Sequence, residues 1–128
     1  MQFPTISEAE RILRLEPPAG KEQMVLDTDT YNEVDDQFAV VQALLSPDKL
    51  DVLALYAAPF FNDRSTGPAD GMEKSYQEIL ALLARLDVSA EGFVFRGSDR
   101  YLPDREHPVE GDAARDLIAK AMARSVED

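Results

Sequence analysis

The sequence predicts an α/β fold with a mainly parallel sheet and helices on both of its faces. Short apolar runs bounded by turn residues alternate with longer segments whose apolar residues recur every three to four positions. The chain has 128 residues, 45% of them hydrophobic, which is enough to bury the core of one ordinary domain. We therefore expect residues 1–128 to form a single domain with the order helix, then strand–helix three times.

The chain opens with an expected helical extension over residues 1–20. The stretch SEAE places Ser7 and Glu10 in a capping-box pattern at the start of a helix. The PPAG stretch that follows is incompatible with a continuing helix. Next, the run QMVLDT at residues 23–28 predicts a short buried strand, bounded by turn residues before it and by acids after it.

From Asp35, the apolar residues recur at the spacing of a helix, and Ser-Pro at residues 46–47 ends that helix. Its expected apolar face comprises Phe38, Val40, Val41, Leu44 and Leu45. The run LDVLALYAA, residues 50–58, predicts a strand that is covered on both sides. A loop rich in Pro, Gly, Asn and Asp follows it.

The second half repeats the alternation. A clear amphipathic helix is predicted by apolar residues that step by four and three: Met72, Tyr76, Ile79, Leu83 and Leu86. The run GFVFRG, residues 92–97, predicts a third short strand, and a long polar loop follows it. A last helix is marked by Ala114, Leu117, Ile118, Ala121 and Met122. Three parallel strands leave an open sheet edge, so we expect a homo-oligomer or a longer protein to cover it.

Composition narrows the classes of partner. The chain has 25 acidic against 13 basic residues, a formal charge of −12, which disfavours nucleic acid and anionic membranes as partners. It has no cysteine, which excludes disulfides, zinc thiolates and cysteine catalysis. No apolar run approaches the roughly 20 residues of a membrane helix, and the N-terminus lacks a signal-peptide pattern. We therefore expect a cytoplasmic protein.

Five acidic residues crowd the turn between the first strand and its helix: Asp27, Asp29, Glu33, Asp35 and Asp36. Ligands of parallel α/β sheets bind beyond the carboxyl ends of the strands, where this turn lies. Two carboxylates 4 Å apart repel by about 4 kcal/mol at an effective dielectric of 20, whereas a helix dipole stabilises each by about 0.3–1 kcal/mol. A hard divalent cation, Ca²⁺ or Mg²⁺, would relieve that repulsion. The alternative is helix capping within a solvated loop.

Two family patterns compete for this turn. The stretch VLDTDT resembles the nucleophile motif of haloacid-dehalogenase-type phosphatases. That resemblance implies attack on phosphorus by Asp27, acid–base catalysis by Asp29 and a bound Mg²⁺. The VDD continuation does not belong to this motif, and its usual glycine-containing turn is absent.

The longer stretch DTDTYNEVDDQFAV resembles the DxDxGxDDxxA signature of inosine–uridine nucleoside hydrolases, with Asp29, Asp35, Asp36 and Ala39 at matching positions. A longer turn, TYNEV, replaces the usual Pro-Gly. Two further matches follow in order: LYAAPFFN, which places Asn62 at the usual Gly-Asn, and VFRGSDRYL after the third strand. Only the N-terminal part of the family's longer chain is matched.

This resemblance implies a Rossmann-like fold and Ca²⁺-dependent hydrolysis of the N-glycosidic bond of ribonucleosides. By the same resemblance, Asp29 binds the ion and acts as general base, Asp36 binds the ion, Asp35 binds ribose hydroxyls and Asn62 orients the ribose. Two protein carboxylates supply few of the six to eight ligands that Ca²⁺ generally takes, so we expect weak binding by this chain alone.

Some expectations concern less informative residues. Asn32 and Glu33 lie in the longer turn and are expected to be solvent-exposed, and His107 in the polar loop is expected at the surface. Asp27 has either a structural role at the strand end or a role behind the metal ligands. A third hypothesis, beside the hydrolase and the phosphatase, is a non-catalytic fragment or ligand-binding remnant that oligomerises through its open sheet edge.

Overall fold

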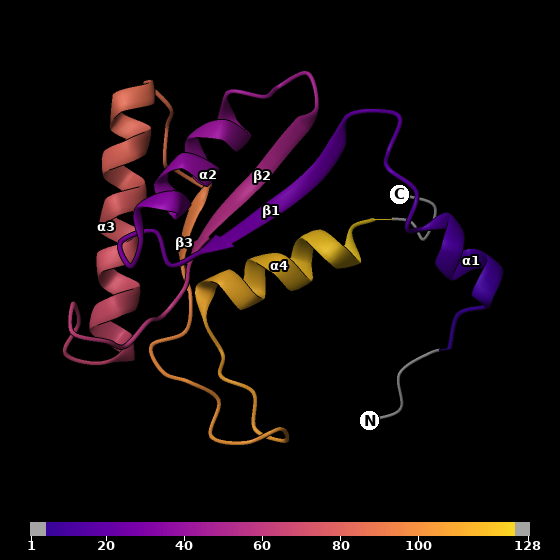
Figure 1. The fold of residues 1–128 in the computed structure, drawn as a ribbon. Coiled ribbons are helices and arrows are strands. Elements are labelled where there is room, and N and C mark those ends of the chain that lie inside the picture. Colours follow the sequence, from indigo (N-terminus) through magenta and orange to yellow (C-terminus); the bar gives the residue numbers. More distant parts are fainter. Residues whose placement is uncertain (1–4, 125–128) are drawn as a thin grey trace.

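The computed structural model describes residues 5–124. Its elements are α1 (Glu8–Leu13), β1 (Glu22–Thr28), α2 (Val34–Leu44), β2 (Leu50–Ala57), α3 (Pro68–Leu86), β3 (Val94–Arg96) and α4 (Asp112–Met122). The strands form one open, all-parallel sheet in the order β1-β2-β3 (Figure 1). The predicted α/β class and order of elements are therefore confirmed. Within the described range, none of the helices combines the length and hydropathy of a membrane-spanning segment.

Helices cover both faces of the sheet. On one face, α2 and α3 pack over β2, and Leu55, Ile79 and Leu83 are almost completely buried there. On the other face, α4 lies on the side of the sheet away from α2 and α3 (Figure 1) and packs near Ala54 and Tyr56 of β2. The central strand β2 is thus covered on both sides, as its apolar sequence predicts.

The parallel pairing brings the carboxyl ends of the strands to one edge of the sheet. β1 pairs with β2 from Glu22 opposite Leu50 to Thr28 opposite Ala57. The turn after β1 and the loop after β2 therefore leave the sheet side by side, and the loop after β3 joins them at the same edge.

The apolar face predicted for α2 is wrong in part. The structure buries Val40 and Ala43, while Phe38 and Leu45 are 70% and 66% exposed. The helix is rotated so that Asp36, Val40 and Ala43, spaced by four and three residues, turn towards the sheet. The hydrogen bond that the Thr28 hydroxyl, at the end of β1, donates to the Asp36 carboxylate fits this rotation.

The predicted apolar stripe is confirmed for α3 but is wrong for most of α4. The predicted stripe of α3 is confirmed, since Met72, Ile79 and Leu83 are buried. Of α4, by contrast, Ala113 is buried, whereas Ile118 and Met122 of the predicted stripe are 63% and 81% exposed. The predicted helix at this place is present, but four of the five residues in its predicted apolar stripe are exposed: Leu117, Ile118, Ala121 and Met122.

The N-terminal helix α1 packs on no part of the sheet, and none of its residues is buried (Figure 1). The Ser7 hydroxyl accepts a hydrogen bond from the Glu10 amide at 3.1 Å, so the predicted N-cap is present. Helical structure in the expected extension is limited to residues 8–13, and residues 1–4 lie outside the described range.

A glycine allows α3 to approach the loop after β2. A Cβ atom at Gly71 would lie 2.0 Å from the carbonyl oxygen of Phe60, far inside van der Waals contact. The Ser75 hydroxyl, one turn later, donates to the Gly71 carbonyl at 3.0 Å. The loop that carries Asn62 is therefore seated directly on the first turns of α3.

Gly71→Ala is expected to lower the free energy of unfolding by about 1 kcal/mol. Overpacking typically costs about 1–3 kcal/mol, which outweighs the gain of about 1 kcal/mol in helix propensity. Urea denaturation measures the change. Gly20→Ala is the matched control, because nothing lies within 4 Å of a Cβ built there. Equal stability of the two variants would contradict the close approach.

An ion pair between Arg96 and Glu73 links β3 to α3. Arg96 donates to the Glu73 carboxylate at 2.7 and 3.0 Å, and its guanidinium lies 3.8 Å from the centre of the Tyr76 ring. Hydrogen bonding from Arg96, and then from Gln77, lowers the pKa of Glu73 from 4.5 to about 2. The ion pair therefore stabilises the fold only where Glu73 is ionised.

Because this pKa is depressed on folding, its contribution is present above pH 4.5 and is lost as the pH falls towards 2. The Glu73 side chain is 42% exposed, so solvent screening limits the contribution to about 1 kcal/mol or less. Glu73→Gln is expected to reduce the loss of stability between pH 5 and pH 2, measured by urea denaturation. Glu91→Gln, at an exposed position, is the control, and an unchanged pH dependence in Glu73→Gln would refute the assignment.

Candidate functional site

A chain of hydrogen bonds joins the turn after β1 to the loop after β2. The Asn32 side-chain amide donates to the Asp29 carboxylate at 2.9 Å, and the Asn32 backbone amide donates to the Asp29 carbonyl at 2.7 Å. The Asn62 side-chain amide donates to the Asn32 side-chain oxygen at 2.6 Å. The Arg64 guanidinium donates to the backbone carbonyl of Asn32. Asp29 and Asn62, two predicted site residues, are therefore linked through Asn32.

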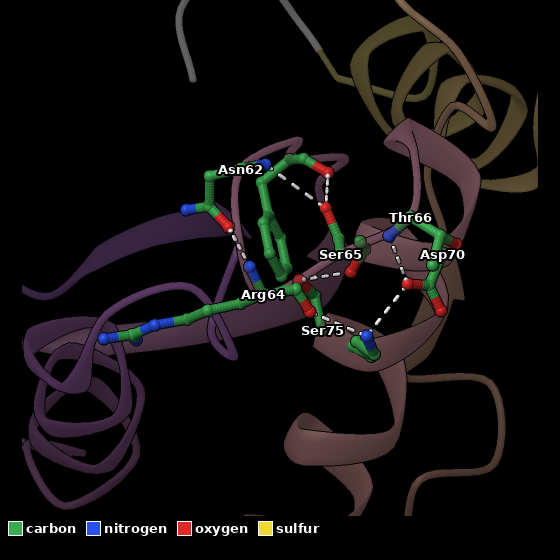
Figure 2. Close-up of polar contacts among 9 residues, drawn as sticks. Asn62, Arg64, Ser65, Thr66, Asp70 and Ser75 are labelled. Atoms are coloured by element: carbon green, nitrogen blue, oxygen red, sulfur yellow. Dashed lines mark hydrogen bonds and ion pairs between the residues drawn. The ribbon is translucent and has the colours of Figure 1, made fainter.

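The loop after β2 holds Asn62 in one orientation. The side-chain oxygen of Asn62 accepts from the Arg64 backbone amide at 2.9 Å, as Figure 2 shows. The backbone amide of Asn62 donates to the Ser65 hydroxyl, which in turn donates to the Phe60 carbonyl at 3.1 Å. Both polar atoms of the Asn62 side chain are engaged, so its direction is fixed by the loop and by Asn32.

A second set of hydrogen bonds ties the start of α2 to the end of β1. The Thr28 hydroxyl donates to the Asp36 carboxylate at 2.6 Å and lies 3.1 Å from the Thr30 hydroxyl. Thr28 and Thr30 are buried, with exposures of 4% and 0%. A buried hydroxyl that holds one carboxylate oxygen orients the other oxygen, which is how proteins position metal ligands from behind.

The first turn of α2 argues against simple helix capping. The N-cap residue, Glu33, makes no side-chain hydrogen bond to the helix, and Asp36 bonds to the Thr28 side chain instead. Glu33 is exposed, as expected from the sequence. Asp35 is also exposed, and within the described part of the chain it forms no hydrogen bond with the Asp29 or Asp36 networks.

Asn32 is the main correction to the sequence-based site. We expected it to be solvent-exposed, but it is half-buried and contacts both Asp29 and Asn62. The longer turn folds back over the loop after β2 and so brings Asn32 between them. Thr28 and Arg64 were not predicted either. The alternation of acids and threonines in DTDT is a signal for Thr28 alone and does not point to Arg64.

The carboxylates have the chemistry of a site for a hard cation. Asp29 and Asp36 each use one oxygen in a hydrogen bond, and among residues 5–124 their other oxygens have no donor. Within the same range, no group of three His, Cys, Asp or Glu side chains converges. The donor type therefore fits Ca²⁺, while most of its usual six to eight ligands, roughly counted, would come from water or from groups outside these residues.

Asp27 lies apart from these networks, at the mouth of a cleft on the α4 side of the sheet. The cleft has a volume of about 250 Å³ and is bounded by the ends of all three strands and by the start of α4. Desolvation, and then the nearby Asp29 carboxylate, raise the pKa of Asp27. No lysine or arginine is among the residues that line this cleft.

The remaining polar candidates are on the surface. His107 is exposed and its ring nitrogen lies 2.8 Å from the Asp104 carboxylate in the loop before α4. Arg100 and Tyr101, in the same loop, are exposed as well. These placements agree with the expectation that His107 is a surface residue.

Comparisons with protein-family models, with curated proteins and with solved structures give no match to this chain. What the chain does must therefore be inferred from its motif and from the geometry of these residues.

Proposed function

We propose that this chain carries the carboxylate part of a Ca²⁺-dependent site that hydrolyses the N-glycosidic bond of ribonucleosides. One observation carries the proposal. Asp29 and Asp36 flank the bend after β1, and each is held through one oxygen by a neighbouring side chain, Asn32 or Thr28. The resemblance of DTDTYNEVDDQFAV to the nucleoside hydrolase signature supports the same assignment for both acids.

The site residues divide the work by their chemistry. Ca²⁺, when bound, supplies Lewis acidity and a fixed position for a water molecule. Asp29 accepts the proton of the attacking water, and the ionised acids around it stabilise the positive charge that develops on the sugar as the bond to the base breaks. Asp36 helps to hold the ion. The exposed carboxylate of Asp35 accepts hydrogen bonds from ribose hydroxyls.

Asn62 acts through position rather than charge. Its side chain is held by Arg64 and Asn32, so its amide is linked to Asp29 through Asn32. A rigid neighbour orients the sugar without further loss of side-chain entropy on binding. We assign Asn32 to the same task, since it links Asp29 to Asn62.

The phosphatase alternative has less support. A nucleophilic Asp27 requires room for a phosphoryl group and cations to neutralise it. The cleft at Asp27 is lined mainly by small and apolar residues and has no lysine or arginine. The non-catalytic alternative, the cytoplasmic location and the homo-oligomer remain predictions. A ribonucleoside substrate and Ca²⁺ are the partners that we propose.

Asp29→Asn is expected to weaken Ca²⁺ binding at least tenfold, about 1.4 kcal/mol, because it removes one of two charged ligands. Calorimetry should give a dissociation constant of about 10⁻⁴–10⁻³ M for the unsubstituted chain, the weak end of the range of protein Ca²⁺ sites, because few of the ligands are charged protein groups. If the unsubstituted chain releases ribose from inosine or uridine, this activity should disappear in the Asp29→Asn variant and when Ca²⁺ is chelated.

Asp48→Asn is the matched control, since Asp48 is exposed in the turn before β2, at the opposite edge of the sheet. Its Ca²⁺ affinity should equal that of the unsubstituted chain. Equal Ca²⁺ affinities for the Asp29 and Asp48 variants would show that Asp29 is not a ligand.

A further inference from the structure

The helix α1 exposes apolar side chains and has no buried residue. It is six residues long, whereas isolated helices shorter than about 12–15 residues are only marginally stable in water. It lies apart from the sheet (Figure 1). Ile12 and Leu13 are 53% and 66% exposed, and Leu15, just after the helix, is 71% exposed. A surface that buries these three side chains would therefore stabilise the helix.

An apolar groove lies between α4 and the first half of β1. It has a volume of about 180 Å³, which equals about six water molecules at about 30 Å³ each. Met24, Val25 and Leu53 line it from the sheet, and Leu117 and Ala121 line it from α4. A space of this size and lining accommodates aliphatic side chains.

The exposed stripe of α4 extends this groove. Leu117 and Ala121 are four positions apart, as are Ile118 and Met122, so the four side chains lie on one face of the helix. All four are exposed. A helix that packs on a sheet usually has charged or polar residues on its outer face. The apolar stripe therefore indicates that a further element covers α4.

The groove carries a positive charge that no acid neutralises. The charged side chains that line it are Lys120 and Arg124. Lys120 is paired with Asp116 at 2.5 Å. Arg124 donates to the uncharged side chain of Gln23, and among residues 5–124 it has no acidic partner. An acidic segment therefore suits this groove, although the whole chain has a formal charge of −12.

The charge of the α1 segment is complementary to that of the groove. Both arginines of α1 are paired within the helix, with glutamates three or four positions before them. Glu16, which follows the helix, is exposed and has no basic partner in the part of the chain that the structure describes. Its charge is opposite to that of Arg124, and complementary charges around an apolar contact favour one partner over others.

The segment between α1 and β1 directs α1 away from the groove of its own chain. It contains Pro17 and Pro18, which favour a stiff, extended conformation. The groove adjoins the first residues of β1, so α1 would have to reverse its direction between Pro18 and Glu22 to reach it. The groove of a second copy requires no such reversal, and exchange of an identical element between protomers is a low-cost route to a dimer.

We propose that α1 of one copy of this chain docks into the groove between β1 and α4 of a second copy, and that the exchange is reciprocal. The aliphatic side chains of α1 cover Leu117 and Ala121, and Glu16 pairs with Arg124. Two-fold symmetry repeats the contact, so each dimer contains it twice. The contact does not involve the turn after β1, so the proposal is independent of the proposed hydrolysis.

Leu13→Glu and Ala121→Glu test the two sides of the contact. Both residues are exposed, so neither substitution places a charge in the core. Sedimentation velocity of the unsubstituted chain should give a dimer dissociation constant below about 100 µM. Each substitution should raise this constant at least tenfold, because it places a carboxylate against an apolar surface. Ala119→Glu is the matched control and should dimerise normally, since Ala119 is exposed on the same helix but does not line the groove.

A mixture of the two variants distinguishes exchange between copies from docking within one chain. Leu13→Glu keeps an intact groove and Ala121→Glu keeps an intact α1, so a mixed dimer has one intact contact and a dimer of either variant has none. With one variant carrying a fluorophore, the mixed dimer should form at least tenfold more tightly than either variant alone.

Three results would overturn the proposal. An unsubstituted chain that is monomeric at every concentration would show that α1 docks within its own chain or nowhere. A dimer that both substitutions leave intact would show a different interface, such as the open edge of β1. Mixed dimers no tighter than those of the single variants would show that α1 is not exchanged.

Discussion

The parallel pairing of β1 with β2 determines where the candidate site residues lie. Thr28 faces Ala57 in the register, so both strands end at the same level and their following segments meet. Asn32 and Asn62, thirty positions apart, come into contact for this reason. Because side chains alternate along a strand, a register shift of one residue would exchange the faces of β1 and separate the two networks from their partners.

That alternation also gives β1 two different tasks. Thr28 turns towards the α2 side, where it holds Asp36, while Asp27 turns towards the α4 side and borders the cleft. Asp36, a proposed cation ligand, and the cleft at Asp27 therefore lie on opposite faces of the sheet, at the end of one strand. Separate hydrogen bonds hold the surrounding segments. Asn62 donates to Asn32 between the turn after β1 and the loop after β2, and Tyr56 donates to Asp116 between β2 and α4.

Much of the fold follows from the periodicity of the sequence, because strands and helices bury their apolar residues with different periods. The rotation of α2 does not, since Phe38 and Val40 are equally apolar and only contact with the sheet decides between them. At the candidate site, the positions of the nucleoside hydrolase motif predict that Asp29, Asp36 and Asn62 lie near the carboxyl ends of the strands. Asn32 was missed because its role depends on how a longer turn folds over a distant loop, which no local pattern encodes.

The central claim is that Asp29 and Asp36 act on one ion. The most direct test is a double-mutant cycle, in which calorimetry gives the Ca²⁺ affinity of the unsubstituted chain, Asp29→Asn, Asp36→Asn and the double variant. Shared coordination predicts a coupling free energy of at least about 1 kcal/mol, because loss of either carboxylate removes much of what the other contributes. Effects that add to within about 0.3–0.5 kcal/mol would show two independent carboxylates and would contradict the claim.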